Sequence, residues 1–358
     1  MKIGVLTYHK TLSQGATFQA YATYRAFKEL GCDVEVVDLA LNIKSPRPKW
    51  QVMLLDVYMS LAYHRQEVFR KTFYPRFSKH YNTLEELRKD PPKVDAVCVG
   101  SDQTWNKGIS SQENFMAYFL DFGPESMPRF SYASSFGFSE WKFDEGEETK
   151  RIGEMLNKYV GLSVRETTAH KMISEKFGLD ASIVCDPTIL HADYNEFTKG
   201  LKQRDEVVCY SLSTSRQPKL QAIEDISKFM GVPIRWMGKP FLVKGAKYTY
   251  FPDVYRWFRV IASSKFVLTD SFHGVVASIL CQKPFVVLYE DNGLSSRIVD
   301  LLTKLGLQDR IFFNYDDFSK SDSWKKPIDY NKINVLLDKF RKTSWDYLKK
   351  VINEISIS

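Results

Sequence analysis

The chain has 358 residues, of which 44% are hydrophobic and 26% charged, the profile of a soluble globular protein with room for two domains. No apolar run approaches the roughly 18 residues of a membrane span, and five scattered cysteines predict neither a disulfide framework nor a zinc site. The formal charge of +7 comes without a polybasic tract, which disfavours nucleic-acid binding and suits a small anionic partner.

The first half of the chain alternates apolar runs with amphipathic stretches, as parallel α/β units do. Strands are predicted at 2–7, 34–39, 94–100, 129–136, 161–164 and 182–185. Helices are predicted at 17–30, 50–88, about 145–159 and 167–177. A polar stretch at 191–205 then suggests a domain boundary.

The alternation restarts after this stretch. Strands are predicted at 206–212, 232–237, 266–270 and 285–289, and helices at 218–230, 254–263, 271–281 and 296–306. The segment 330–355 predicts one long helix with too few apolar residues for a core of its own. We therefore expect two Rossmann-like α/β domains that face each other across a cleft, at 1–192 and 193–328, with a C-terminal helix at 329–358 packing back across both.

The segment 268–274 (LTDSFHG) is the most informative one in the sequence. An apolar strand ends at Asp270, and Ser271 is placed to cap the next helix, whose N-terminus would stabilise an anion. His273 falls in the first helical turn, and Gly274 would let a ligand approach the backbone. The alternative interpretation is an ordinary Asp/Ser cap with a buried histidine.

Two other loops follow predicted strands and carry polar side chains. Arg165 ends the strand at 161–164 and is suited to a bidentate grip on carboxylate or phosphate, although a surface pair with Glu166 would look the same. The loop 100–106 offers polar groups beside an aromatic face, which suits sugar recognition but also an ordinary capped turn. Its candidate binding residues are Ser101, Asp102, Gln103, Trp105 and Asn106.

The loop 9–19 is a weaker candidate anion site, with Gly15 and Gln19 at the start of a helix. Several nucleotide and metal motifs are missing from the sequence. It holds no GxGxxG, GxxxxGK[ST], HExxH or GxSxG segment and no Cys/His set with zinc spacing. We therefore expect neither a bound metal nor a nicotinamide cofactor.

Together these segments resemble the polysaccharide pyruvyl transferase family. The resemblance runs through KIGVLT at 2–7, GATFQAYA at 15–22, VGSDQTWN at 99–106, SYASSFG at 131–137, LSVRE at 162–166, CDPT at 185–188, TDSFHG at 269–274 and KPF at 283–285. It implies an architecture similar to the two-domain GT-B glycosyltransferases, with the acceptor on the N-terminal domain and the donor on the C-terminal one. It also implies transfer of a pyruvyl group from phosphoenolpyruvate, as donor substrate, to a sugar as a ketal, with no cofactor.

The resemblance implies that Arg165 and His273 hold the donor. Relatives carry arginine-leucine-histidine where this chain has Ser271-Phe272-His273, and Arg297 is our candidate replacement for the missing arginine. Asp270 and His273 are expected as the catalytic acid–base pair, without an assignment of which does what.

Two other functions stay open at this point. A nucleotide-sugar glycosyltransferase of the same architecture would need a carboxylate for the ribose, for which only Glu290 and Asp291 are near. A non-catalytic sugar-binding relative would bind phosphoenolpyruvate without turnover. The acceptor could be free, nucleotide-linked or lipid-linked. A cytoplasmic protein is expected, and peripheral contact with the inner face of a membrane is compatible with the sequence.

Overall fold

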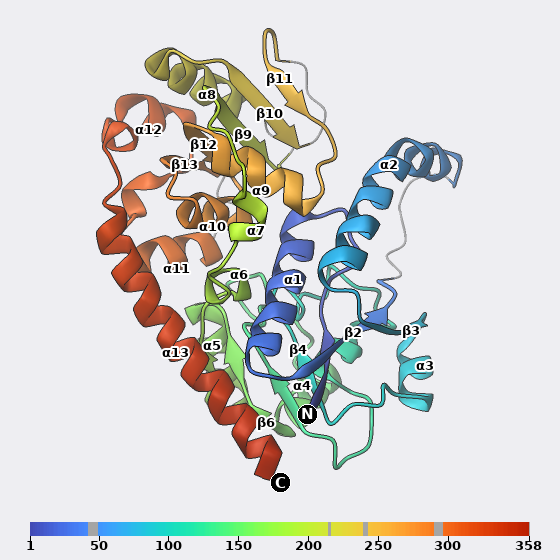
Figure 1. Ribbon diagram of the computed structural model, residues 1–358. Coiled ribbons are helices and arrows are strands. Elements are labelled where there is room, and N and C mark those ends of the chain that lie inside the picture. The colour runs from blue at the N-terminus through green and yellow to red at the C-terminus, as the bar shows by residue number, and fades with distance from the viewer. Residues whose placement is uncertain (42–48, 214–215, 239–242, 290–295, 358) are drawn as a thin grey trace. The chain divides into compact units, whose positions relative to one another are not determined.

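The computed structural model describes residues 1–41, 49–213, 216–238, 243–289 and 296–357, with side chains described from 59 onward in the second of these ranges. The chain divides into two compact α/β units (Figure 1). Unit 1 comprises Met1–His191 and Asp338–Ser358, and unit 2 comprises Ala192–Leu337. Unit 2 is therefore inserted into unit 1 near the end of the chain.

Unit 1 is built on a six-stranded, fully parallel sheet in the order β3-β2-β1-β4-β5-β6, with a separate parallel pair β7-β8. Its strands are β1 Lys2–Leu6, β2 Asp33–Leu39, β3 Phe77–Tyr81, β4 Ala96–Val99, β5 Arg129–Ser131, β6 Tyr159–Gly161, β7 Ser163–Val164 and β8 Ser182–Ile183. Its helices are α1 Gln14–Glu29, α2 Lys49–Phe73, α3 Leu84–Lys89, the 3-10 helix η1 Phe115–Phe119, α4 Glu147–Leu156, α5 Thr167–Phe177 and α6 Pro187–Leu190.

Unit 2 repeats the arrangement with the order β11-β10-β9-β12-β13-β14, again fully parallel. Its strands are β9 Val207–Ser211, β10 Ile234–Gly238, β11 Lys247–Thr249, β12 Phe266–Thr269, β13 Phe285–Leu288 and β14 Ile311–Phe312. Its helices are α7 Asn195–Thr198, α8 Gln217–Met230, α9 Val254–Ser263, α10 Phe272–Leu280, α11 Ser296–Lys304, α12 Tyr315–Lys320 and the 3-10 helices η2 Gln308–Arg310 and η3 Ser323–Lys325.

Both sheets have the Rossmann strand order, in which the first and fourth strands lie side by side and the chain leaves them in opposite directions. The central strands are buried on both faces, which explains their continuous apolar runs: β4, β12 and β13 have no exposed residue. Each unit has its own apolar core around its sheet. The sequence prediction of two Rossmann-like α/β domains is confirmed.

The predicted helix at 50–88 is wrong in its second half. The helix α2 ends at Phe73, and the chain then forms the edge strand β3 and the short helix α3. Lys79 and His80 are exposed in the middle of β3, so this strand lacks the apolar run by which the central strands were predicted.

The last helix, α13 Tyr330–Ile357, packs back onto the chain as predicted. Its first residue, Tyr330, donates a hydrogen bond to the carbonyl oxygen of Lys283 in unit 2. From residue 338 onward it belongs to unit 1, where Tyr347 donates to the carbonyl oxygen of Ser131 over 2.8 Å. Figure 1 shows this part of the helix running beside β6, and a Cβ at Gly161 would meet Val351 at 2.5 Å.

Candidate functional site

In unit 2 the carboxyl end of β12 leads directly into α10, as the sequence predicts. Ser271 is the N-cap of this helix, with an extended backbone, and its hydroxyl accepts a hydrogen bond from the Gly274 N–H at 3.3 Å. This turn lies where β9 and β12 are neighbours, which is the topological switch point of the sheet. Ligands of open parallel sheets bind at this place, and a helix N-terminus there favours an anion.

Asp270 turns toward the loop after β9 and is almost fully buried, with a side chain 2% exposed. Its carboxylate accepts hydrogen bonds from the Ser211 hydroxyl at 2.8 Å and from the Leu212 and Ser213 N–H groups at 2.7 and 3.1 Å. Lys219, also 2% exposed, lies 3.3 Å away. The carboxylate therefore ties together the two loops at the switch point, and this geometry favours a positioning role over the predicted acid–base role.

His273 lies in the first turn of α10 and is 5% exposed. Its ring centroid is 5.2 Å from that of Phe272 in an edge-to-face arrangement. Arg297, near the start of α11, places its guanidinium 6.0 Å from the Phe272 ring. The structure thus brings His273, Ser271 and the candidate replacement Arg297 to the same end of α10.

Gly274 allows close packing of α10, and ligand approach to its backbone stays a prediction. A Cβ at this position would meet the Thr269 hydroxyl at 2.4 Å and the Tyr210 ring at 3.1 Å. The absent side chain therefore lets α10 pack closely on β9 and β12.

In unit 1 Arg165 is buried among carboxylates, with its side chain 3% exposed. Its guanidinium lies 2.6 Å from Asp186 and 3.8 Å from both Glu166 and Asp102. Burial alone would lower the pKa of Arg165, but these carboxylates outweigh it and raise that pKa further. The alternative interpretation, a surface pair with Glu166, is therefore wrong, because the arginine is the centre of a buried ionic cluster.

The loop 101–106 is held by hydrogen bonds at the edge of the same cluster. Ser101 donates to Asp186 at 2.9 Å, and the Gln103 side-chain oxygen accepts from the Asn106 amide at 2.7 Å. Asp102 has φ of +77°, a left-handed conformation that costs free energy in a residue with a side chain. Such strained residues gather at functional sites, so Asp102 stays a candidate for ligand binding.

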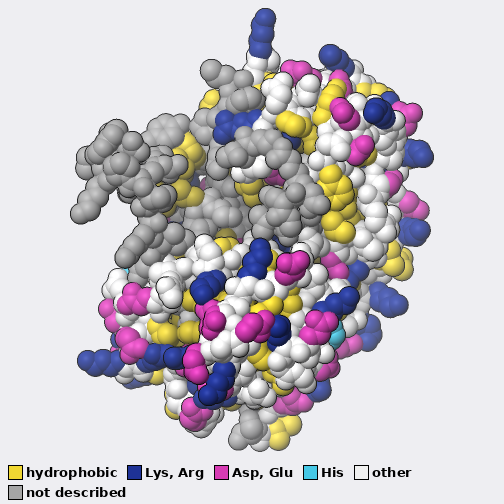
Figure 2. All heavy atoms as spheres, turned by 180° about the vertical axis from the view of Figure 1, so that it is seen from behind, with side chains coloured by type: hydrophobic (Ala, Val, Ile, Leu, Met, Phe, Trp, Pro, Cys, Tyr) yellow, Lys and Arg dark blue, Asp and Glu magenta, His cyan; other side chains and the backbone are white. Residues whose placement is uncertain are grey.

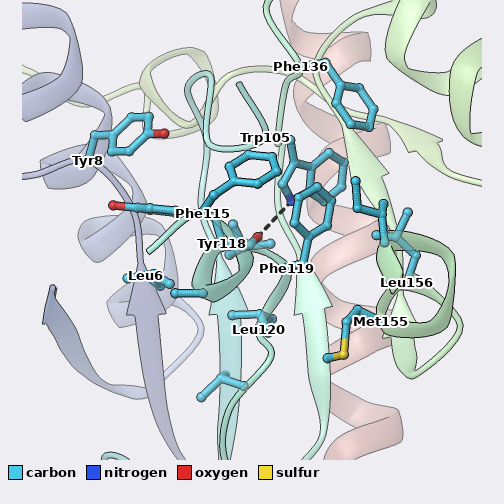
Figure 3. Packing of buried hydrophobic residues seen from close by; sticks show 14 of the residues in the cluster. Leu6, Tyr8, Trp105, Phe115, Tyr118, Phe119, Leu120, Phe136, Met155 and Leu156 are labelled. Carbon is cyan, nitrogen blue, oxygen red and sulfur yellow. Dashed lines mark hydrogen bonds between the residues drawn. The ribbon is translucent and has the colours of Figure 1, made fainter. Parts of the chain in front are cut away.

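Trp105 does not offer its ring to a ligand, which is a second correction. The side chain is fully buried and its indole N–H donates to the carbonyl oxygen of Tyr118 at 2.9 Å (Figure 3). Its ring stacks on Phe119 with 5.6 Å between centroids and packs against Phe136. Trp105 is therefore part of the core of unit 1 and cannot form a sugar platform.

Gln19 and Gly15 lie in α1, at the switch point between β1 and β4. Gln19 is fully buried, and its amide nitrogen lies 2.8 Å from the Thr7 hydroxyl and 2.9 Å from the carbonyl oxygen of Ala16. It thus anchors α1 to the end of β1. Gly15 is buried in the first turn of α1, behind the N-cap Ser13. Both residues shape the loop after β1, and direct contact with a ligand stays a prediction.

A cluster of basic groups that the sequence does not predict surrounds Asp38 in β2. The carboxylate lies 3.2 Å from His9 Nε2, 3.1 Å from His80 Nδ1 and 3.3 Å from Lys10 Nζ. These residues follow, or lie in, three neighbouring strands, so a prediction of β3 as a strand would have placed them together. Without β3 as a predicted strand, the sequence does not bring His80 close to Asp38.

Neither a metal centre nor a membrane-spanning helix is found in the described part of the chain. No group of three or more His, Cys, Asp or Glu residues there is arranged to hold a metal ion, and no helix there is long and apolar enough to cross a bilayer. All five cysteines are free. Glu290 and Asp291, the candidate ribose ligands, lie outside the described residues.

Basic and acidic side chains alternate on the face shown in Figure 2, where the described residues form no broad area of one sign. Positive charge is therefore not concentrated in one patch among the described residues of that face.

Solved structures of nucleotide-sugar enzymes share the fold. Putative UDP-N-acetylglucosamine 2-epimerase from Listeria monocytogenes is 12% identical, with a TM-score of 0.54 over 95% of this chain and 90% of the other. UGT89C1 from Arabidopsis thaliana, complexed with UDP, is 11% identical, with a TM-score of 0.54 over 99% of each chain. The UDP-GlcNAc 2-epimerase of Methanocaldococcus jannaschii, in complex with UDP-GlcNAc and UDP, is 12% identical, with a TM-score of 0.51 over 99% of this chain and all of that one.

These structures identify the fold as that of the GT-B glycosyltransferases and epimerases. No curated protein matches the sequence. The family model of the polysaccharide pyruvyl transferases matches residues 15–292, more than three quarters of the chain and both units. The chain therefore belongs to the polysaccharide pyruvyl transferase family.

Proposed function

We propose that this protein transfers the pyruvyl group of phosphoenolpyruvate to two hydroxyls of one sugar, forming a ketal and releasing phosphate. The observation that carries the proposal is the family match across both units. The geometry at the N-terminus of α10 supports it, because a capped helix start, a histidine and an arginine gather there at the switch point of the sheet.

The charge of phosphoenolpyruvate suits the N-terminus of α10. Phosphoenolpyruvate carries a carboxylate and a phosphate on a small frame, so it needs several hydrogen-bond donors and positive charge within a short distance. The N-terminus of α10 contributes the partial positive charge of the helix dipole. Arg297 lies beside that turn and would supply the full charge that Ser271 cannot.

The proposed reaction balances without a further reactant. The methylene carbon of phosphoenolpyruvate takes a proton, which leaves an oxocarbenium-like centre at the neighbouring carbon. One sugar hydroxyl forms a C–O bond to that carbon and loses its proton. The C–O bond to phosphate breaks, and a second hydroxyl of the same sugar closes the ketal and also loses its proton. Of the two protons released, one restores the acid and the other leaves with the phosphate.

His273 is the residue that we assign to proton transfer. A histidine changes its protonation state near neutral pH, and this one stands in the turn where the donor is expected to bind. Asp270 is instead a positioning residue, because its carboxylate is already saturated by Ser211, the following loop and Lys219. Arg165 has a positioning role in this proposal, because it is the centre of the ionic cluster that fixes the loops at the carboxyl edge of unit 1.

The test is a turnover assay with phosphoenolpyruvate and a panel of galactosides, glucosaminides and mannosaminides, read by phosphate release and by the mass of the pyruvylated sugar. His273→Asn should lower kcat by about 10²–10⁴-fold, the usual contribution of a general acid–base group. Exposed His64 provides the control, His64→Gln, which should leave kcat unchanged.

Donor binding is measured separately by thermal stabilisation with phosphoenolpyruvate and with UDP- and GDP-sugars. Arg297→Gln should weaken phosphoenolpyruvate binding about tenfold or more, because a charged hydrogen bond contributes about 1.5–3 kcal/mol. Arg256→Gln, at an exposed position of α9 in the same unit, is the matched control. Stabilisation by a nucleotide-sugar alone, without phosphate release from phosphoenolpyruvate, would overturn the proposal in favour of glycosyl transfer.

A further inference from the structure

A small pocket of about 300 Å³ opens at the carboxyl ends of β1 and β2 in unit 1, and its wall includes the start of the loop 9–19. Its walls include His9, Lys10 and His80 on the polar side and Leu39, Leu41 and Tyr118 on the apolar side. The volume is at the lower end of the range for small-molecule sites, about 300–1,000 Å³. A pocket of this size admits one compact group of a ligand.

The hydrogen-bond partners of His9 favour the positively charged form of its ring. The ring is 3% exposed, and its Nδ1 lies 3.0 Å from the carbonyl oxygen of Thr7. Its Nε2 lies 3.2 Å from the carboxylate of Asp38. Both partners can only accept a hydrogen bond, so both ring nitrogens must donate, and a histidine with two N–H groups is a cation.

The pocket holds more positive than negative charge. Asp38 is the carboxylate that His9, Lys10 and His80 share. Burial alone would raise the pKa of Asp38, but the hydrogen bond from His9 and the three neighbouring basic groups outweigh it and hold that pKa well below its usual range. One carboxylate thus faces two cations, His9 and Lys10, and a third whenever His80 is protonated.

The nearby Arg70 does not change this balance. It donates a hydrogen bond to the carbonyl oxygen of His9 at 3.4 Å, and its charge is compensated by an ion pair with Glu67. The surplus therefore resides on Lys10 and His80, whose side chains are 50% and 43% exposed and can turn toward a ligand. An uncompensated positive charge in a partly enclosed pocket attracts an anion.

We propose that this pocket binds the phosphate or diphosphate of a phosphate-bearing sugar, as a subsite for the acceptor. The inference rests on the proposed function, which requires a sugar acceptor. Phosphate suits the pocket because its several oxygens can accept from separate donors, whereas the two oxygens of Asp38 are already shared among three. The hydroxyl of Thr7, also in the wall, donates to the carbonyl oxygen of Ser101, so the pocket adjoins the loop after β4.

The test is calorimetric titration of the full-length protein with inorganic pyrophosphate, inorganic phosphate and glucuronate, in the presence of saturating phosphoenolpyruvate. The double variant Lys10→Met/His80→Gln removes the two exposed donors and leaves the buried His9–Asp38 pair intact. It should weaken pyrophosphate binding at least tenfold, as expected when charged hydrogen bonds are lost. If phosphoenolpyruvate does not bind, the α10 site stays open to pyrophosphate. The same titration on His273→Asn/Arg297→Gln, which impairs the α10 site, then distinguishes binding in this pocket from binding at α10.

The matched control is Lys71→Met/His64→Gln, which removes the same charges from exposed positions of α2 in the same unit. It should bind pyrophosphate like the wild type, and equal thermal midpoints would show that both double variants fold. Unchanged pyrophosphate binding in Lys10→Met/His80→Gln, no binding in the wild type, or tighter binding of glucuronate than of pyrophosphate would each overturn the inference. Pocket-dependent binding without phosphoenolpyruvate turnover would overturn the proposed reaction and leave the phosphate site standing.

Discussion

The two units share one topology but differ in the charges that they place at the carboxyl ends of their strands. Both sheets are parallel and have the same strand order. In unit 1 this edge carries the Arg165 cluster with three carboxylates and the Asp38 cluster with three basic groups. In unit 2 the described edge carries the Asp270–Lys219 pair, whose charges compensate each other, and one arginine, Arg297, beside the cap of α10.

This difference shows that the strand order decides where a ligand binds but leaves open what the ligand is. A helix N-terminus beside a compensated ion pair and one arginine favours a small anion through the helix dipole and a single full charge. An edge lined by ionised side chains selects its ligand through those side chains. Each buried charge there is stable only while its partner of opposite charge is present. The variants below test whether the two edges differ in this way.

Arg165→Ala should have the largest effect, a loss of about 3–5 kcal/mol in the free energy of unfolding, because it leaves Asp186 and Glu166 buried without their cation. Hydrogen exchange by mass spectrometry should show the loss in peptides of unit 1. The exposed Arg151, paired with Asp121, supplies the control Arg151→Ala, with an expected loss below about 1 kcal/mol. Equal losses of unfolding free energy in Arg165→Ala and Arg151→Ala would contradict the inference that the Arg165 cluster is buried and stabilising.

Asp270→Asn should cost less, about 1–3 kcal/mol, because an amide oxygen can still accept from part of the loop after β9 while Lys219 loses its carboxylate. Exchange should increase in unit 2, around β9 and α10. The control is Asp205→Asn, since that carboxylate is 82% exposed and pairs with Lys265 on the surface. Wild-type stability combined with lost turnover would show instead that Asp270 takes part in proton transfer.

Glu206→Gln should have the smallest effect and a defined pH dependence. Hydrogen bonds from Arg235 and Lys247 outweigh burial and lower the pKa of Glu206 from the usual 4.5 to about 2. Its contribution, about 1–2 kcal/mol after allowance for the exposed Lys247, is present above pH 4.5 and is lost as the pH falls toward 2.

Urea denaturation at several pH values measures this difference. Wild type and Glu206→Gln should differ most near pH 7 and converge toward pH 2. The control in unit 1 is Glu35→Gln, which breaks the more exposed pair with Lys2 and should cost less than about 1 kcal/mol. A difference between wild type and Glu206→Gln that does not change with pH would show that the carboxylate is not the cause.

The sequence predicted central strands well and edge strands poorly, for a physical reason. Residues in β4 and β12 are covered on both faces and must be apolar, so their runs stand out. The strands β3, β11 and β14 each lie at the edge of a sheet and are short or partly exposed. With little surface to bury, these three strands need no apolar run, and no pattern in the sequence predicts them.

The candidate site shows the same limit. The positions of Asp270 and Ser271 at the start of a helix could be predicted because strand, cap and helix are consecutive in the sequence. The partners of Asp270 could not, because Ser211 and Leu212 lie 59 and 58 residues away and meet it only when β9 and β12 pair. The burial of Trp105 likewise depends on Phe119 and Phe136, which come later in the chain.

The insertion of unit 2 into unit 1 sets an order of completion during synthesis. Unit 2 ends at Leu337, so every residue of it has been made before Asp338 adds the last part of unit 1. Until then Cys185 lacks the Ser344 hydroxyl to which its N–H donates, and Ser131 lacks the phenol of Tyr347. Unit 1 is thus the first unit to begin and the last to be completed, because the helix that contacts its sheet is synthesised after all of unit 2.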